Sequence, residues 1–183
     1  MFKVILLIAI CAAACYGAPG TPETYCGEAP NNLFRCLSAP ILIGNEASQK
    51  CKSSPTECDR IKCLFRESKW TDGDAVDKEK FSTFLNNFAK NHPEWSSAVD
   101  HAKTECLGES LKPQGIYLNC PTFDITHCVY TSFIKNSASS QWSNEESCAN
   151  ARQYAHSCPV CPTDCFAPSI PKGSCNACYL RPT

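Results

Sequence analysis

The sequence predicts an all-α protein, a compact bundle of about five to seven short helices cross-linked by disulfides. Two observations predict this class. Apolar residues recur at helical spacing in several segments, and these segments carry helix start and stop signals. Cysteine is also frequent, with 16 in 183 residues, and the cysteines lie within and between those segments.

The first 17 residues have the layout of a secretory signal peptide. Lys3 precedes an apolar run over residues 4–14, and the small residues around Gly17 suit cleavage. The apolar run is too short to span a bilayer comfortably, so we expect no membrane insertion. We expect residues 18–183 to be secreted to the extracellular space as one domain.

Export places the cysteines in an oxidising compartment, where an even set predicts disulfides. Fourteen cysteines follow the signal peptide, which itself contains Cys11 and Cys15. The expected disulfide cysteines are Cys26, Cys36, Cys51, Cys58, Cys63, Cys106, Cys120, Cys128, Cys148, Cys158, Cys161, Cys165, Cys175 and Cys178. The spacing of the last five is similar to that of zinc ligands, but export favours disulfides, so we expect no metal and no other cofactor.

The charge of the sequence excludes one class of partner. The formal net charge is −1 with both signs scattered, so no basic patch suggests a nucleic-acid partner.

The helical domain is flanked by two segments of different composition. Residues 18–53 are predicted to form an irregular, cysteine-containing N-terminal arm with one apolar run, Ile41–Ile43. Residues 54–158 form the predicted helical domain. Prolines and cysteines in residues 159–183 predict a stapled tail packed on that domain.

The first predicted helix begins at Ser54. Ser54 and Glu57 form a capping box, and Pro55 occupies the first helical position, where proline is favoured. Cys58 and Cys63 are five residues apart, so their side chains point about 140° apart around a helix. They cannot bond to each other there, and we expect each to join this helix to a different element.

Two further helices follow the turn predicted at residues 72–74. Asp77 is the expected cap of the first, and Pro93 ends it and starts the second, which stops near Gly108. The first has an apolar face made of Phe81, Phe84, Leu85 and Phe88. The second has a face made of Trp95, Ala98, Val99, Ala102 and Cys106. Both faces repeat at the spacing of one buried helix side.

The last two predicted helices lie in residues 120–158. One is led in by Cys120-Pro121-Thr122 and runs to Lys135, with Ile125, Cys128, Val129 and Phe133 facing inward. A polar loop at 136–141 separates it from the other, which opens at a second capping box, Ser143 to Glu146, and runs to about His156. On that helix Cys148, Ala151, Ala155 and Cys158 share one side.

The cysteine spacing resembles that of a known family. Cys58, Cys63 and Cys106, with 42 residues (64–105) between the last two, and Cys158 followed by Pro159 resemble insect odorant-binding proteins. The stretch containing Leu64-Phe65, Asp72-Gly73, Phe81, Trp95 and Ala98 looks like that family's third and fourth helices. The additional cysteines and the Cys-Pro step are similar to the Plus-C subgroup of these pheromone and general odorant-binding proteins. The resemblance covers residues 58–158.

The resemblance also implies a disulfide pattern. The family usually has three residues between its second and third cysteines and eight between its late pair. Here Cys58 and Cys63 have four between them, and Cys120/Cys128 and Cys148/Cys158 have seven and nine, so the fifth and sixth cysteines stay open. The family's interlocked pairing is first to third, second to fifth and fourth to sixth. It implies that Cys63 joins Cys26, Cys36 or Cys51, and that Cys106 joins a late cysteine.

The function that the resemblance implies is that of a secreted carrier, not an enzyme. It would transport small hydrophobic molecules such as odorants or pheromones in an internal apolar cavity, in the perception of smell. A membrane receptor or a second copy of the chain are the further partners it implies. The predicted cavity walls are Phe81, Phe84, Leu85, Phe88, Trp95, Val99, Tyr117, Phe123, Val129, Phe133 and Tyr154. The polar groups expected to orient a ligand are Tyr117, Tyr130, Tyr154 and Thr126.

Three other interpretations compete with this one. Apolar helix faces alone predict an ordinary core, because such faces are general features of helical proteins. A proline- and cysteine-rich tail also suits a defence protein or a protease inhibitor. A phospholipase A2-like hydrolase is the enzyme alternative, but His127 is followed by Cys128, and the chain lacks a glycine-rich calcium loop. Finally, His92, His101, His127 and His156 raise the hypothesis of pH-dependent ligand release.

Overall fold

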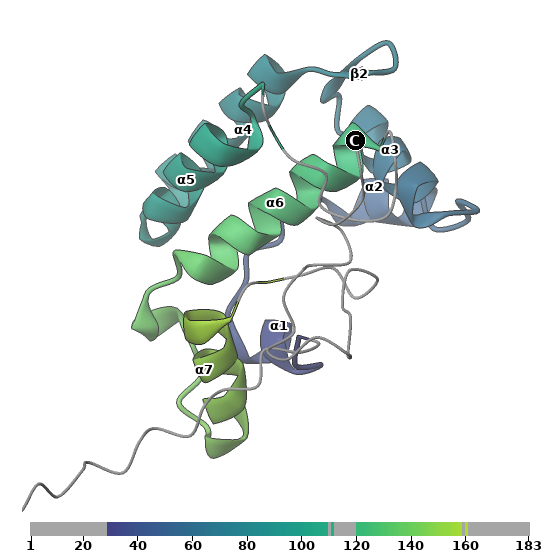
Figure 1. Cartoon of the computed structure of the whole chain (residues 1–183). Helices are drawn as coiled ribbons and strands as arrows, with labels where there is room; N and C mark the ends of the chain where they lie inside the picture. Colours follow the sequence, from purple (N-terminus) through teal and green to yellow (C-terminus); the bar gives the residue numbers. More distant parts are fainter. Residues whose placement is uncertain (1–28, 110, 112–119, 159, 161–183) are drawn as a thin grey trace, which may run out of the picture.

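The computed structural model of the chain describes residues 29–109, 111, 120–158 and 160 (Figure 1). The α-helices in this part of the chain are α1 Leu33–Cys36, α2 Asn45–Lys50, α3 Glu57–Glu67, α4 Lys78–Asn91, α5 Ser96–Cys106, α6 Pro121–Lys135 and α7 Ala149–Ser157. Short 3₁₀ turns cover Pro93–Trp95, Ser139–Gln141 and Glu146–Cys148. The predicted all-α, disulfide-linked class is confirmed. None of the helices in these residues is long and apolar enough to cross a membrane.

Several predictions fall on residues outside the described part. The signal peptide (1–17), most of the tail (159–183) and the apolar segment 116–118 belong to this group. The same holds for the individual residues Cys26, Tyr117, Cys161, Cys165, Cys175 and Cys178.

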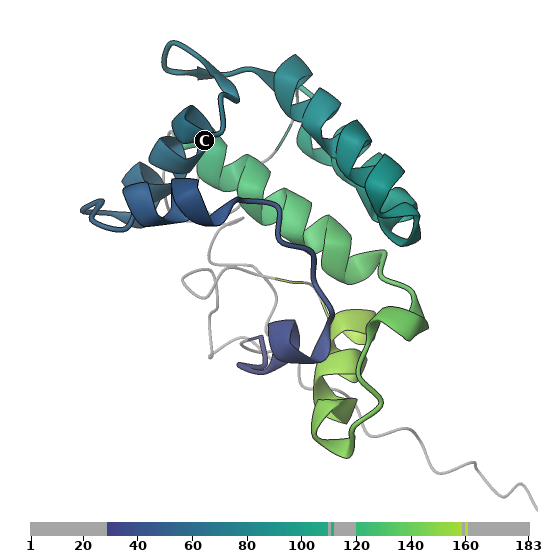
Figure 2. The ribbon, with the colours of Figure 1, turned by 180° about the vertical axis from the view of Figure 1, so that it is seen from behind.

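Helix α6 is the central element, and the others pack around it (Figures 1 and 2). Helix α5 lies along α6 and packs against α4, whose Phe88 also meets Phe133 of α6, while α3 crosses the first turns of α6. Helix α7 follows the far end of α6 and packs against α1. The segment between α1 and α2 is extended and runs beside α6 to bring α2 against α3.

The starts of α3 and α7 differ from the sequence prediction. The cap of α3 is Thr56, whose hydroxyl accepts a hydrogen bond from the Asp59 amide at 3.1 Å, so the helix begins two residues later than Ser54 and Pro55 suggested. At the second predicted box, the Ser143 hydroxyl accepts from the Glu145 amide in a local turn, and α7 begins only at Ala149. In both cases the predicted capping serine lies before the true helix start, and Ser143 bonds to a nearby backbone amide there instead.

The predictions for α4 and α5 are confirmed in detail. The Asp77 carboxylate caps α4 by accepting from the Lys80 amide at 2.9 Å. Pro93 ends α4 and opens a 3₁₀ turn that leads into α5. The turn predicted at 72–74 is a hairpin between β1 Thr71–Asp72 and β2 Ala75–Val76, two strands that the sequence did not predict. Gly73 has a φ of +57°, which a glycine adopts without strain.

The N-terminal arm is more regular than predicted, because α1 and α2 lie within it. Both helices are short, with 4 and 6 residues, and neither carries a side-chain cap hydrogen bond. Helices of this length are not stable on their own, so tertiary contacts and disulfides must hold them. Because α1 and α2 depend on contacts with distant parts of the chain, the local sequence carries no helix signal for them.

The buried core is formed by one face of each long helix. Ile61, Leu64 and Phe65 of α3 are buried, as are the α7 residues predicted to share a side. The rest of the core comes largely from α4, α5 and α6, through Phe81, Leu85, Phe88, Trp95, Ala98, Val99, Ala102, Ile125, Val129, Phe133 and Ile134. Helical periodicity therefore identified most of the core of the long helices, but Phe84 and Cys128, which were predicted to face inward, are only half-buried.

Three disulfides interlock the region we call the helical body (residues 45–135). Cys51 bonds to Cys63, Cys58 to Cys120 and Cys106 to Cys128. As predicted, Cys58 and Cys63 join α3 to two different elements. Counted in chain order, these six cysteines pair first to third, second to fifth and fourth to sixth, which is the order that the resemblance implies.

A fourth disulfide holds a second region, the α1–α7 unit (residues 32–37 and 141–158). Cys36 bonds to Cys148 across a sequence separation of 112. The backbone adds a bridge between Leu37 and Trp142, with Ser143 donating its amide to the Cys36 carbonyl at 2.7 Å. Cys158 is also disulfide-bonded, so it is not a metal thiolate.

Candidate ligand-binding groove

An apolar groove lies where the extended segment after α1 passes over α3 and α6. Its volume is about 460 Å³, within the range of small-molecule sites. It is lined by Phe34, Ala39, Pro40, Ile41, Leu42, Ile43, Ser48, Arg60, Leu64 and Tyr130. Pro40 has no backbone amide hydrogen that would need a hydrogen-bond acceptor. The backbone is extended at this point, and it places the apolar run Ile41–Ile43 along the groove.

The groove continues into a second hollow of about 190 Å³ between α3 and α6. The two share Ile43, Arg60, Leu64 and Tyr130, and the second adds Phe123, Thr126 and His127 from α6. Together they form one continuous surface along the α3–α6 junction. This surface has mostly apolar walls and a few polar groups, which is the composition of sites for small hydrophobic molecules.

The interior beneath the groove is filled. Tyr130 and Ile43 also border a space inside the bundle, which is enclosed further by Phe65, Trp70 and Phe81, but its volume is about 10 Å³. That is about the room for one water molecule. The aromatic rings explain why: the ring centroids of Trp70 and Phe81 are 4.7 Å apart, and those of Phe65 and Phe81 are 5.3 Å apart.

Two large apolar side chains of the groove face the solvent. Phe34 is 56% exposed and Ile41 is 82% exposed, and they are the exposed large hydrophobic residues of the described part of the chain. The Phe34 ring meets the Tyr130 ring edge to face, with centroids 6.0 Å apart. Exposed apolar residues that gather beside a hollow mark a binding surface more often than singly scattered ones do.

The polar groups of the groove differ in how they are used. The Arg60 guanidinium is already used in an ion pair, because its Nε and Nη2 donate to the Glu57 carboxylate at 2.8 and 2.6 Å. These hydrogen bonds raise the pKa of Arg60, so the side chain stays charged. The Tyr130 hydroxyl makes no hydrogen bond within the described residues. Burial raises the pKa of Tyr130, so the phenol stays protonated and available as a donor.

The residues predicted to line a cavity fall into three groups. Phe123 lines the second hollow, and Phe81 and Val129 border the small interior space. Phe84 is half-buried and packs on Trp70, with centroids 4.6 Å apart. The rest of the described set, Leu85, Phe88, Trp95, Val99, Phe133 and Tyr154, is buried in the core and borders neither the groove nor the second hollow.

The groove was only partly visible in the sequence. Tyr130 and Thr126 were predicted as polar groups of a site, and both border the hollows. The remaining wall comes from the N-terminal arm, where Ile41–Ile43 was the single apolar run in a polar stretch. That run was the available signal, but the sequence does not show which helices the arm crosses.

The histidine, cysteine and serine side chains that could be considered for catalysis are all held in structural contacts. His127 stacks on Phe123, and its neighbour Cys128 is in a disulfide and has no thiolate. His101 Nδ1 lies 3.0 Å from Ser132 Oγ, but Ser132 is 1% exposed, and its hydroxyl donates to the Cys128 carbonyl at 3.0 Å. This histidine–serine pair therefore secures α5 to α6 beside the Cys106–Cys128 disulfide.

Comparison with known proteins adds no assignment. No protein-family model matches the chain, and a search of curated proteins finds no match.

Proposed function

We propose that the protein is a secreted carrier of small hydrophobic molecules, which bind in the groove between residues 39–43, α3 and α6. One observation supports this most directly: a hollow of about 460 Å³ has apolar walls, includes the exposed Phe34 and Ile41, and contains the Tyr130 hydroxyl, which has no hydrogen-bond partner among the described residues. A ligand would cover apolar surface that water now contacts, and Tyr130 would donate to its oxygen atom.

The disulfides support the secreted character and the kind of carrier. Several disulfides in one domain are typical of exported proteins, because the cytosol keeps thiols reduced. The interlocked order of Cys51–Cys63, Cys58–Cys120 and Cys106–Cys128 is the order that the resemblance to insect odorant-binding proteins implies. Cys36 and Cys148 are then two of the additional cysteines, which are similar to those of the Plus-C subgroup.

Binding in this groove would be reversible and without covalent chemistry. Each Å² of apolar surface removed from water contributes about 25 cal/mol, so a ligand that buries much of its surface overcomes the cost of ordering. The helices that form the floor of the groove are fixed by disulfides. A fixed floor lowers the ordering cost, because less of the protein must be immobilised when the ligand binds.

The test is displacement of the fluorescent probe N-phenyl-1-naphthylamine by long-chain alcohols, measured on the folded protein. We expect the wild type to bind the probe with a dissociation constant on the order of micromolar. Phe34→Ala and Ile41→Ser should each weaken it several-fold. Tyr130→Phe should leave the apolar probe unchanged and weaken the alcohols.

The matched control is Phe84→Ala. Phe84 is also a partly exposed helical phenylalanine, but it packs on Trp70 away from the groove. If Phe84→Ala weakens the probe while Phe34→Ala does not, the site lies in the interior and the groove is the wrong location. If the wild type does not bind the probe at all, the carrier function itself fails.

A further inference from the structure

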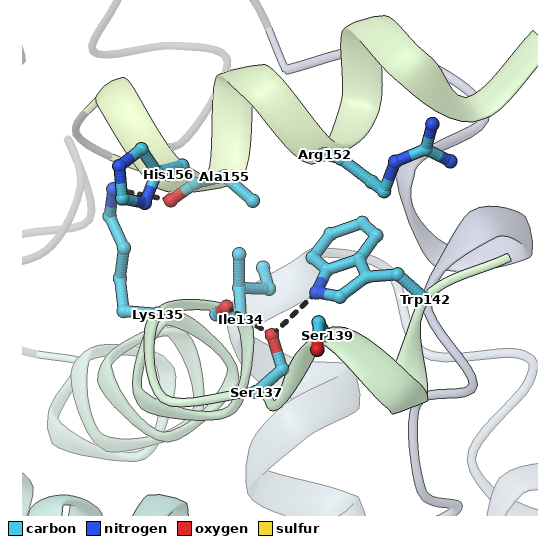
Figure 3. A pocket seen from close by; sticks show the side chains of 8 residues that line it. All are labelled: Ile134, Lys135, Ser137, Ser139, Trp142, Arg152, Ala155 and His156. Carbon is cyan, nitrogen blue, oxygen red and sulfur yellow. Dashed lines mark hydrogen bonds between the residues drawn. The ribbon is translucent and has the colours of Figure 1, made fainter. Parts of the chain in front are cut away.

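A separate pocket lies between the end of α6 and α7. Its volume is about 260 Å³, and it is lined by Ile134, Lys135, Ser137, Ser139, Trp142, Arg152, Ala155 and His156 (Figure 3). It shares no lining residue with the groove. Its volume is below the about 300 Å³ at which most small-molecule sites begin, so it suits a small ligand.

The lining of this pocket is basic and has no acidic member. Lys135, Arg152 and His156 contribute to it, and no aspartate or glutamate does. Within the described residues none of the three forms a salt bridge with a carboxylate. Arg152 instead donates Nη1 to the backbone carbonyls of Ser143 and Glu145, which fixes the wall of the pocket.

Lys135 has an incompletely used ammonium group. Its side chain crosses from α6 to α7 and donates to the Ala155 carbonyl at 2.7 Å, beside His156 (Figure 3). An ammonium carries three donors, so two remain without a protein partner in the described part of the chain. Burial lowers the pKa of Lys135, because the charged form loses water against α7 without gaining an anion.

An apolar surface adjoins this cationic end. The indole of Trp142 lies in the pocket with Ile134 and Ala155, and its ring is kept in place because Nε1 donates to Ser137 Oγ at 2.8 Å (Figure 3). Ser137 in turn donates to the Ile134 carbonyl at 2.8 Å. The pocket therefore presents an oriented aromatic face at one end and cationic donors at the other.

We propose that this pocket binds a small organic acid, with its carboxylate on Lys135 and His156 and its apolar body against Trp142. A carboxylate would supply the anion that Lys135 lacks and accept the two unused donors. An aromatic ring or a short alkyl chain fits the remaining space. This site is independent of the groove and of the proposed carrier function.

The experiment uses benzoate as the probe and benzamide as its uncharged analogue. Each is titrated into the ¹⁵N-labelled protein, and the indole N–H signals of Trp70, Trp95 and Trp142 are followed. We expect benzoate to shift the Trp142 signal saturably and to leave Trp70 and Trp95 unchanged, because those two are buried elsewhere in the core. Benzamide should bind about tenfold more weakly, since it offers no charge-assisted hydrogen bond.

The lysine is tested with a matched pair of variants. Lys135→Met should weaken benzoate about tenfold and leave probe binding in the groove unchanged. Lys90→Met is the control, because Lys90 also lies in the last turn of a helix but does not line the pocket. The proposal is overturned if benzamide binds as well as benzoate, if both lysine variants act alike, or if Trp142 does not respond. In the last case Lys135 serves only to cap α7.

Discussion

The helical body and the α1–α7 unit are built by different means. The body contains the long helices, and its order follows from apolar faces that meet along α6 and from three interlocked disulfides. The α1–α7 unit consists of short elements from the two ends of the described chain. The Cys36–Cys148 disulfide and backbone hydrogen bonds between residues 36–38 and 141–143 join its two parts, and Cys158 is disulfide-bonded as well. Neither α1 nor α7 has a side-chain cap hydrogen bond.

The difference explains where the hollows lie. Regular helix faces pack closely, and the space bordered by Phe65, Trp70 and Phe81 inside the body is about 10 Å³. The two candidate sites lie where the body meets the α1–α7 unit or the segment that leads from it: the groove includes Phe34 of α1, and the basic pocket lies between α6 and α7. A further hollow of about 330 Å³ lies on the body itself beside the β-hairpin, and its lining is mainly polar. The body therefore supplies rigidity, and the junction supplies the apolar and aromatic walls of the two candidate sites.

Removal of a disulfide from each region is the strongest way to test this division. Cys58→Ala/Cys120→Ala should lower the global free energy of unfolding by about 2–5 kcal/mol, because the bond restricts a long loop in the unfolded chain. Cys36→Ala/Cys148→Ala should instead release the α1–α7 unit and leave the body folded. Denaturant unfolding gives the first quantity, and amide hydrogen exchange shows which helices lose protection.

The two double variants are controls for each other, since each removes one disulfide and leaves no free thiol. If loss of the Cys36–Cys148 bond deprotects α4, α5 and α6 as strongly as α7, the molecule is one cooperative unit and the division is wrong.

A smaller effect separates the core from the groove. Phe133 is 1% exposed and packs against Trp95, so Phe133→Ala should lower the free energy of unfolding by about 3–5 kcal/mol. Phe34→Ala should cost less than about 1 kcal/mol, because the ring is already largely in water. Chemical denaturation of both variants measures the two values. Similar losses would show that Phe34 is a core residue and would remove the groove from consideration.

The sequence predicted the body better than the α1–α7 unit for a physical reason. In the body, helix faces such as Phe81 to Phe88 carry a periodic apolar signal that depends only on neighbouring residues. The divergence of Cys58 and Cys63 also follows from local helix geometry. In the α1–α7 unit, Cys36 meets Cys148 from a separation of 112 residues, and no local pattern indicates which distant residue is the partner.

The site was less predictable than the fold for the same reason. Periodicity gave Phe88, Trp95 and Phe133 as buried, but burial does not distinguish a packed core from a cavity wall. The groove depends on the path of residues 39–43 across α3 and α6, which is a tertiary feature. Among the polar groups expected to orient a ligand, Tyr130 and Thr126 border the hollows, whereas Tyr154 is buried in the core.

The helix caps give a weaker and more local test. Thr56→Ala should lower the free energy of unfolding by about 1 kcal/mol, because the Asp59 amide loses its acceptor at the start of α3. Ser54→Ala, at the position that the sequence favoured, should change it by less than about 0.5 kcal/mol. Thermal or denaturant unfolding compares them. A larger loss for Ser54→Ala would restore the helix start that the sequence predicted.

The smallest expected effect is the pH dependence at the cap of α4. Hydrogen bonds from the Lys80 side chain and then its amide lower the pKa of Asp77 below its ordinary value, so the folded state binds the carboxylate's proton less readily than the unfolded state. The stabilisation is therefore complete above the ordinary pKa and is lost as the pH falls through the lowered one. Asp77→Asn keeps an acceptor for the cap but removes the charge. The difference in the free energy of unfolding between this variant and the wild type should therefore shrink in that acid range. Unfolding measured from pH 7 to pH 2 tests this, and a difference independent of pH would assign the role of Asp77 to the cap hydrogen bond alone.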